Sequence, residues 1–223
     1  MSAPGLRERK KQRMFQTLSD VAVELFLEKG FDAVSVAEVA AAAEVSKPTL
    51  FRYFPAKEDL VLHRIADHED EAARVAREGP APIEALRRHF LAGLERGDPV
   101  TGLNGHPAVL AFHRLLYGTP ALVARMHTQL ERSEAALAEA LGGNLEARLA
   151  AGQIIAVQRI LALENWRRIA AGERVEDVRG DAVAAAERAF AGLAAGLGER
   201  LAVGSSGPVG PSGPSGTAGP SAG

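Results

Sequence analysis

The stretch VSKPTLFRYFPAKEDL, residues 45–60, is the most informative part of this sequence. It is rich in aromatic and basic residues, and no acidic residue appears in it before Glu58. Ser46 is a preferred helix N-cap and Pro48 is tolerated in a first helical turn, so a helix is expected from Ser46 to about Tyr53. Pro55 then ends this helix. The stretch predicts a short helix whose surface carries positive charge and no carboxylate.

A second short helix is predicted immediately upstream. Ser35 and Glu38 have the spacing of a capping box, in which each side chain bonds the backbone N–H of the other residue. This helix runs to about residue 43, and residues 44–45 form a turn before the next helix. Two short helices joined by such a turn form a helix-turn-helix, whose second helix can enter the major groove of DNA.

The first turn of the second helix carries the residues that such motifs direct at base edges. These residues are Ser46, Lys47, Pro48 and Thr49. The Lys47 ammonium can donate to guanine, and the Thr49 methyl group can contact thymine. A carboxylate in this segment would face phosphate charge, which gives a physical reason for the absence of acids.

Residues that flank this turn are expected to contact the DNA backbone. Arg52, Tyr53 and Lys57 can hold phosphates on either side of the base-reading turn. Phe51 and Phe54 are expected in the core, because aromatic side chains in a short helix more often pack than protrude.

The rest of the chain also has helical periodicity. Apolar residues recur every three or four positions in residues 7–29, and Gly30 is suited to end that helix. A long helix is predicted from Lys57 to about residue 77, before the break at 79–82. Further helices are expected at 82–96, 107–117, 119–141, 144–172 and 176–202. The predicted organisation is a helix-turn-helix domain at 1–56, a connecting helix at 57–80, a larger helical domain at 81–202 and a disordered Gly/Pro/Ser-rich tail at 203–223.

Composition limits the classes of protein that this chain can represent. The 223 residues carry a net charge of −2, so any contact with nucleic acid must be local. There is no cysteine, which excludes disulfides and fits a reducing cytoplasm. No apolar run approaches the roughly 20 residues that span a bilayer. No phosphate-binding loop, zinc-binding or nucleophile motif is present, so we expect no catalytic residue, metal ligand or cofactor.

The segments LFLEKGFDAVSVAEVA and VAEVAAAAEVSKPTLFRYFPAKEDLV resemble the DNA-binding domain of the TetR family of bacterial transcriptional regulators. The resemblance covers about residues 8–65. It implies an all-helical homodimer whose N-terminal domains bind a palindromic operator. It also implies a C-terminal domain that dimerises and holds a small-molecule pocket. Ligand binding there would release the operator, which favours a repressor over an activator.

The resemblance also implies roles for particular residues. Ser35 corresponds to a phosphate contact, Lys47, Pro48 and Thr49 to base-reading positions, and Tyr53 and Lys57 to phosphate contacts. The basic start of the chain, residues 9–11, either reaches DNA or frays.

Two residues depart from the family pattern. Glu44 stands where glycine is frequent, so a left-handed turn would cost about 1 kcal/mol and a slightly altered turn is expected. Ala56 stands where a Ser or Asn cap is frequent, so one side-chain partner for the amides of the next helix is missing.

The larger helical domain offers a dimer interface and a pocket. The two last helices carry apolar stripes, which either pair with a second subunit or face their own core. TetR-like proteins use these helices to dimerise. Candidate pocket residues combine apolar bodies with a few polar tips. They are Phe90, His106, Leu110, His113, Tyr117, Met126, Asn165 and Trp166.

A helical scaffold or partner-binding protein without affinity for DNA is the alternative. It would share the amphipathic helices but would have no need of Lys47 or Thr49. The salt dependence of duplex binding separates these two classes, because phosphate contacts release counterions.

Overall fold

The computed structural model describes residues 5–66 and 68–203, and within these ranges the regular structure is entirely helical. The all-helical prediction is therefore confirmed. The predicted Gly/Pro/Ser-rich tail lies outside the described residues, except for residue 203. The helices are α1 (Leu6–Lys29), α2 (Val36–Ala42), α3 (Lys47–Tyr53), α4 (Lys57–Ala66), α5 (Glu71–Ala76), α6 (Pro82–Arg96), the 3₁₀ turn η1 (Pro99–Thr101), α7 (Pro107–Gly118), α8 (Pro120–Ala140), α9 (Leu145–Ala170) and α10 (Val175–Val203).

The caps that were predicted from the sequence set the helix boundaries in the N-terminal part. The Ser35 hydroxyl accepts from the Glu38 amide at 3.2 Å, and the Glu38 carboxylate accepts from the Ser35 amide at 2.7 Å. The Ser46 hydroxyl accepts from the Thr49 amide at 3.2 Å and caps α3. Each cap satisfies an amide that would otherwise lack a partner at a helix start.

The single long helix expected from Lys57 to residue 77 is wrong. The chain forms α4 and α5 separately, with a turn between them at residues 68–70. His68, Glu69 and Asp70 offer no apolar side chain to a buried stripe, and Asp and His are weak helix formers. The turn lets α4 pack on α1 while α5 packs on α6, and both helices also contact α8.

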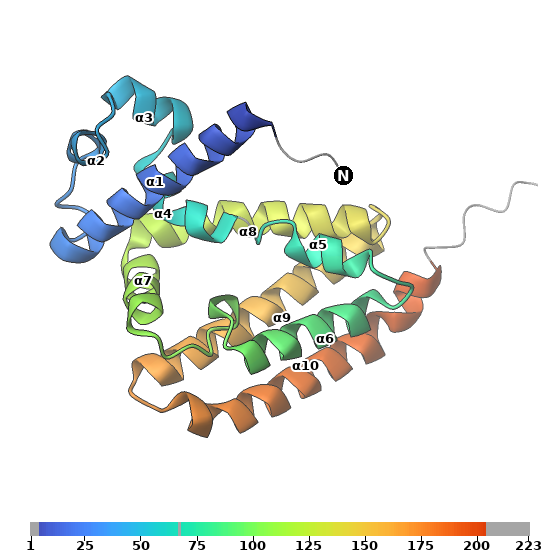
Figure 1. The fold of residues 1–223 in the computed structure, drawn as a ribbon. Helices are drawn as coiled ribbons and strands as arrows, with labels where there is room; N and C mark the ends of the chain where they lie inside the picture. Colours follow the sequence, from blue (N-terminus) through green and yellow to red (C-terminus); the bar gives the residue numbers. More distant parts are fainter. Residues whose placement is uncertain (1–4, 67, 204–223) are drawn as a thin grey trace, which may run out of the picture.

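Two hydrophobic cores hold the molecule together. One lies among α1–α4 and includes Leu18, Phe26, Leu50 and Leu60, which are fully buried. The other lies among α5, α6, α8, α9 and α10. Figure 1 shows α1–α3 as a head at one end, α6 and α10 at the opposite end, and α8 running between them.

The head is not packed independently of the rest of the chain. Phe112 and Leu116 of α7, and Leu122 and Met126 of α8, belong to the same core as α1–α4. The buried Ser19 hydroxyl also donates to the Leu60 carbonyl oxygen at 2.7 Å, joining α1 to α4. A movement in α7 or α8 therefore bears directly on the head. No described helix is long and apolar enough to cross a membrane.

Candidate functional site

The second helix of the helix-turn-helix presents the predicted base-reading residues at the surface. Ser46, Lys47 and Pro48 are exposed and Thr49 is half-buried. The Ser46 and Thr49 hydroxyls are hydrogen-bonded to each other at 2.8 Å. Leu50, fully buried on the opposite face, anchors α3 in the core of the head. The first turn of α3 thus offers one ammonium group, a proline ring and a threonine side chain to a partner.

The prediction for Phe51 is wrong, whereas that for Phe54 is confirmed. Phe54 is buried, but Phe51 is 41% exposed. In a helix of seven residues, Leu50 and Phe54 occupy the core face one turn apart, which leaves Phe51 on the surface. The Lys47 ammonium lies 5.8 Å from the centroid of the Phe51 ring. Phe51 therefore extends the exposed patch that Lys47 begins.

The residues predicted to hold phosphates lie beside this patch. Arg52 is exposed, and its guanidinium lies 5.5 Å from the Tyr53 ring centroid. The Tyr53 ring packs edge-on against Phe15 of α1, with centroids 4.9 Å apart. Ser35 is exposed at the start of α2, where free amides favour an anion. These positions bring Ser35, Arg52 and Tyr53 to the surface; their contact with DNA remains a prediction.

Lys57 has a structural role that the sequence did not reveal. Its ammonium donates to the Phe31 carbonyl oxygen and lies 4.2 Å from the centroid of the Phe31 ring. Lys57 thereby ties the first turn of α4 to the connection between α1 and α2. Its phosphate contact remains a prediction, and replacing it would alter the packing of the head as well as its charge.

The first turn of α4 is capped despite the alanine at position 56. The Asp59 carboxylate accepts from the Ala56 amide at 3.1 Å, so this amide is satisfied from inside the helix. The same carboxylate accepts from both Arg125 Nε at 2.8 Å and Arg125 Nη2 at 3.2 Å. This bonding raises the pKa of the Arg125 guanidinium, which stays charged. Asp59 thus connects α4 to α8, a link that spacing in the sequence could not show.

The turn between α2 and α3 keeps the left-handed geometry that a glycine would favour. Glu44 has φ of 55°, the only positive value at a described residue other than glycine. Its amide donates to the Ala41 carbonyl oxygen at 3.1 Å, and the Val45 amide donates to the Ala40 carbonyl oxygen at 2.9 Å. These two bonds form a Schellman motif. The expectation of an altered turn is therefore wrong, because the bonds and packing of the turn hold Glu44 in a strained conformation.

Glu44→Gly is expected to raise the free energy of unfolding by about 0.5–1 kcal/mol. The gain is the left-handed strain removed, about 1–2 kcal/mol, less the greater chain entropy of glycine. Urea denaturation measures this difference. Glu44→Gln is the matched control, since it removes the charge and keeps the strain. An equal gain in both variants would assign the effect to charge.

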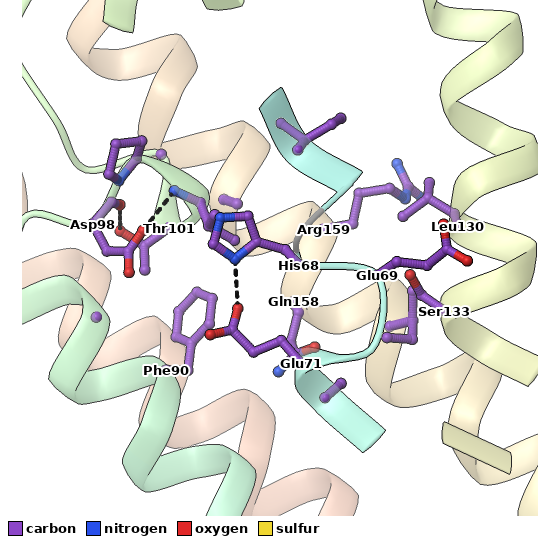
Figure 2. A pocket seen from close by; sticks show the side chains of 18 of the residues that line it. His68, Glu69, Glu71, Phe90, Asp98, Thr101, Leu130, Ser133, Gln158 and Arg159 are labelled. Atoms are coloured by element: carbon purple, nitrogen blue, oxygen red, sulfur yellow. Dashed lines mark hydrogen bonds and ion pairs between the residues drawn. The ribbon is translucent and has the colours of Figure 1, made fainter. Parts of the chain in front are cut away.

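A cavity of about 220 Å³ lies in the body of the molecule, which is the part formed by helices α5 to α10. Its walls come from helices α4 to α9, from η1 and from the turn between α4 and α5. Figure 2 shows His68 and Glu71 facing each other in this wall, with the ring of Phe90 nearby. Among the residues predicted for a pocket, the structure gathers Phe90, His113, Tyr117, Met126 and Trp166 around this cavity. Their contact with a ligand remains a prediction.

The other predicted pocket residues lie elsewhere. His106 is exposed and caps α7, its Nδ1 accepting from the Ala108 amide at 3.3 Å. Leu110 packs against the hydrophobic core of the body. Asn165 is buried and donates to the Thr101 carbonyl oxygen at 2.9 Å, which fastens η1 to α9. None of these three side chains lines the cavity.

A polar cluster in the cavity wall was not predicted. The Glu71 carboxylate pairs with His68 Nδ1 at 2.8 Å and with His89 Nε2 at 3.2 Å. The hydrogen bond from His68 lowers the pKa of Glu71, against the opposing effect of burial. No group of three side chains suited to a metal ion occurs among the described residues. The cluster instead joins α5 and α6 beside the turn that follows α4.

An aromatic corner formed by His113, Tyr117 and Trp166 lines another part of the cavity. The Tyr117 and Trp166 rings have centroids 4.8 Å apart, and those of His113 and Trp166 are 6.2 Å apart and perpendicular. His113 Nδ1 and Trp166 Nε1 are buried without a hydrogen-bond partner in the described structure. Burial lowers the pKa of His113, so the imidazole is neutral near pH 7.

Acidification is expected to destabilise the protein through His113. The folded-state pKa is lowered, so the unfolded chain takes up the proton first, below the ordinary value of 6.5. Stability from this residue is present above about pH 6.5 and is lost as pH falls from there towards the folded pKa, at up to about 1.4 kcal/mol per pH unit. Urea denaturation of the wild type and of His113→Phe between pH 7.5 and about 5 measures this slope.

The matched control is His127→Phe, because His127 is exposed. The wild type and His127→Phe should show the same slope, and His113→Phe a shallower one. A slope unchanged in His113→Phe would contradict the neutral, buried imidazole.

A capped helix-turn-helix head fixed to a helical body is the architecture of bacterial transcriptional regulators of this fold. Residues 18–63 match the family model described as bacterial regulatory proteins, tetR family. The segment that forms the head of the chain is therefore a domain of the TetR family.

Individual relatives agree with this assignment. The chain is 34% identical to the HTH-type transcriptional regulator TcmR of Streptomyces glaucescens over 142 residues, which cover 61% of this chain and 62% of that protein. The other curated relatives are matched over 20% to 44% of their own lengths.

Solved structures show the same fold. Salmonella enterica GusR superposes with a TM-score of 0.53 at 19% identity, covering 83% of this chain and 96% of that one. NalD, described as the secondary repressor of the MexAB-OprM multidrug efflux pump in Pseudomonas aeruginosa, has a TM-score of 0.55 at 17% identity, covering 81% and 96%.

Proposed function

We propose that this protein is a transcriptional repressor that binds a palindromic operator as a homodimer and releases it when a small molecule occupies the cavity. The observation that carries the proposal is the exposed first turn of α3, where Lys47, Pro48 and Thr49 stand clear of any carboxylate in that helix. Such a turn can enter a major groove without meeting phosphate repulsion. The naming of TcmR as a transcriptional regulator and of NalD as a repressor supports this reading.

Exposed apolar side chains support a dimer interface on the last two helices. Leu145, Leu149 and Ile160 of α9 are 56%, 53% and 56% exposed and lie on one face of that helix. Val183 of α10 is also exposed, at 37%. Large apolar side chains grouped in this way mark surfaces that a partner covers. A two-fold dimer would present two α3 helices to the two halves of an inverted repeat.

The ion pair between Asp59 and Arg125 connects α8 to α4, the helix that packs on α1 of the head. Arg125→Gln is expected to lower the free energy of unfolding by about 1 kcal/mol, because a forked but partly exposed ion pair is lost. Thermal or urea unfolding measures this loss. Arg132→Gln is the matched control, since Arg132 also lies on α8 but reaches Glu69 only at 4.0 Å. Equal losses in the two variants would show that general charge, and not this link, is responsible.

Selection of duplexes from a random pool tests the proposed function. The purified full chain should enrich an inverted repeat, and affinity for that repeat should fall steeply with salt, by about 0.9 in log K per log unit of salt for each phosphate contacted. Cross-linking or light scattering of the complex should give two chains per repeat. Failure to enrich any sequence would reject the operator-binding proposal and favour a helical protein that binds another partner.

A further inference from the structure

The aromatic corner of the cavity holds two polar atoms that the protein itself leaves unsatisfied. His113 is 9% exposed and its Nδ1 has no partner in the described structure, nor has Trp166 Nε1. A buried polar atom without a hydrogen bond costs free energy, typically about 1–3 kcal/mol. Both atoms belong to side chains that line the cavity. An occupant that bonds them would recover this cost.

The chemistry of the two atoms restricts the group that can bond them. The Trp166 N–H only donates, so the occupant must bring an acceptor to it. A neutral imidazole nitrogen at His113 either accepts or donates, according to the tautomer. One oxygen satisfies both atoms. A hydroxyl can accept from Trp166 and donate to His113, and a carbonyl oxygen can accept from both. The two rings are perpendicular with centroids 6.2 Å apart, so both nitrogens belong to one corner of the cavity wall.

The corner favours a neutral oxygen over a carboxylate. The burial that lowers the pKa of His113 would also penalise a charged group placed beside it. Of the carboxylates in the cavity wall, Glu71 is already paired with His68 and His89. Burial also raises the pKa of Tyr117, and this effect outweighs the opposite influence of Arg159 and Arg167, so the corner disfavours charge despite these two guanidinium groups.

Size and the remaining walls favour a single aromatic ring. A dry apolar cavity of about 150 Å³ is enough for benzene, so about 220 Å³ accommodates one ring with a small substituent. Tyr117 and Trp166 supply ring faces and edges on one side, and Phe90, Met126 and Leu130 supply apolar contacts on others. Aromatic side chains favour offset or edge-on contact with another ring.

We propose that the cavity binds a one-ring aromatic molecule bearing a neutral hydroxyl or carbonyl oxygen, with that oxygen hydrogen-bonded to Trp166 Nε1 and His113 Nδ1. The inference rests on the proposed function in one respect: the bound molecule is taken to be the effector that releases DNA. Binding itself can be measured without an operator.

Calorimetric titration of the full chain with phenol, acetophenone, toluene and benzoate tests the ligand class. Phenol, acetophenone or both should bind roughly threefold to tenfold more tightly than toluene, which lacks the oxygen, and benzoate should bind less tightly than these. Comparable affinity for phenol and acetophenone identifies an acceptor oxygen. Preference for phenol identifies a hydroxyl that also donates to His113.

Two substitutions assign the preference to the corner. Trp166→Phe and His113→Phe keep a ring at each position but remove the nitrogen, so each should reduce the ratio of phenol affinity to toluene affinity by roughly threefold to tenfold. Phe90→Leu is the matched control, because it should weaken both probes alike and leave the ratio unchanged. Cooperative unfolding of each variant, followed by circular dichroism, shows that it is folded.

Toluene binding as tightly as phenol, a ratio that survives both corner substitutions, or no binding of any probe would overturn the inference. The outcome is separable from the proposed function. Enrichment of an operator without binding of these rings rejects the ligand class and leaves the regulator intact. Binding of phenol without operator enrichment rejects the regulator and leaves the ligand class.

Discussion

Gly102→Ala is expected to lower the free energy of unfolding by about 3 kcal/mol or more. A Cβ atom added to Gly102 would lie 1.9 Å from the Ala162 carbonyl oxygen and 3.0 Å from the Trp166 amide nitrogen. Both atoms are backbone atoms of α9, so no side-chain rotation can relieve the overlap. Gly102 also has φ of 73°, which adds about 1 kcal/mol for a residue with a side chain. The turn η1 would have to move away from α9.

That displacement would have a second cost. The buried amide of Asn165 donates to the Thr101 carbonyl oxygen at 2.9 Å, and this bond would lengthen or break. An unsatisfied buried amide costs about 1–3 kcal/mol. Because Thr101, Gly102 and Trp166 all line the cavity, the substitution should also shift the fluorescence of Trp166, the only tryptophan in the chain.

Gly97→Ala is the matched control for this prediction. Gly97 has a similar φ of 66°, but the nearest atom to its added Cβ is the Leu103 carbonyl oxygen at 3.8 Å. Gly97→Ala should lower the free energy of unfolding only by the cost of a left-handed backbone at a residue with a side chain, about 1 kcal/mol. Urea denaturation of both variants separates the cost of the overlap with α9 from the cost of the left-handed backbone. A similar loss in both would mean that the close approach of η1 to α9 contributes nothing to stability.

The parts of this fold that sequence predicted well are those governed by neighbours in the chain. The caps at Ser35 and Ser46 depend on residues three positions away, and both form as expected. The turn at residues 68–70 was missed because local pattern alone did not exclude a continuous helix. The chain bends there so that α4 and α5 can contact different helices, α1 and α6 respectively.

The candidate sites divide in the same way. The exposed turn of α3 is a local feature, so its residues could be named from spacing, although Phe51 was misplaced because a seven-residue helix has room for few core positions. The cavity depends on contacts between distant segments. Asn165 was expected to line the pocket, but its partner, Thr101, lies 64 residues away and makes it a structural residue. Asp59 and Arg125 are separated by 66 residues and carried no local signal.

Lys47→Ala is expected to weaken operator binding by about 10²- to 10⁴-fold. Lys47 is exposed at the first position of α3, and no described carboxylate pairs with it. A lysine that donates to guanine contributes about 1–3 kcal/mol of discrimination against a wrong base. The proposed dimer places two copies of Lys47 on one operator, so the binding free energy lost is twice that of a single lysine.

Binding assays on the selected inverted repeat and on an unselected duplex, each over a range of salt, measure this effect. Lys29→Ala is the matched control, because it removes the same charge from an exposed site at the end of α1, outside the proposed reading surface. Lys47→Ala should lose far more affinity on the repeat than on the unselected duplex, and Lys29→Ala should stay within about twofold on both. An equal loss of affinity on both duplexes would make Lys47 a phosphate contact. The reading of bases would then rest on Pro48, Thr49 and the exposed ring of Phe51, which the first turns of α3 also present to a groove.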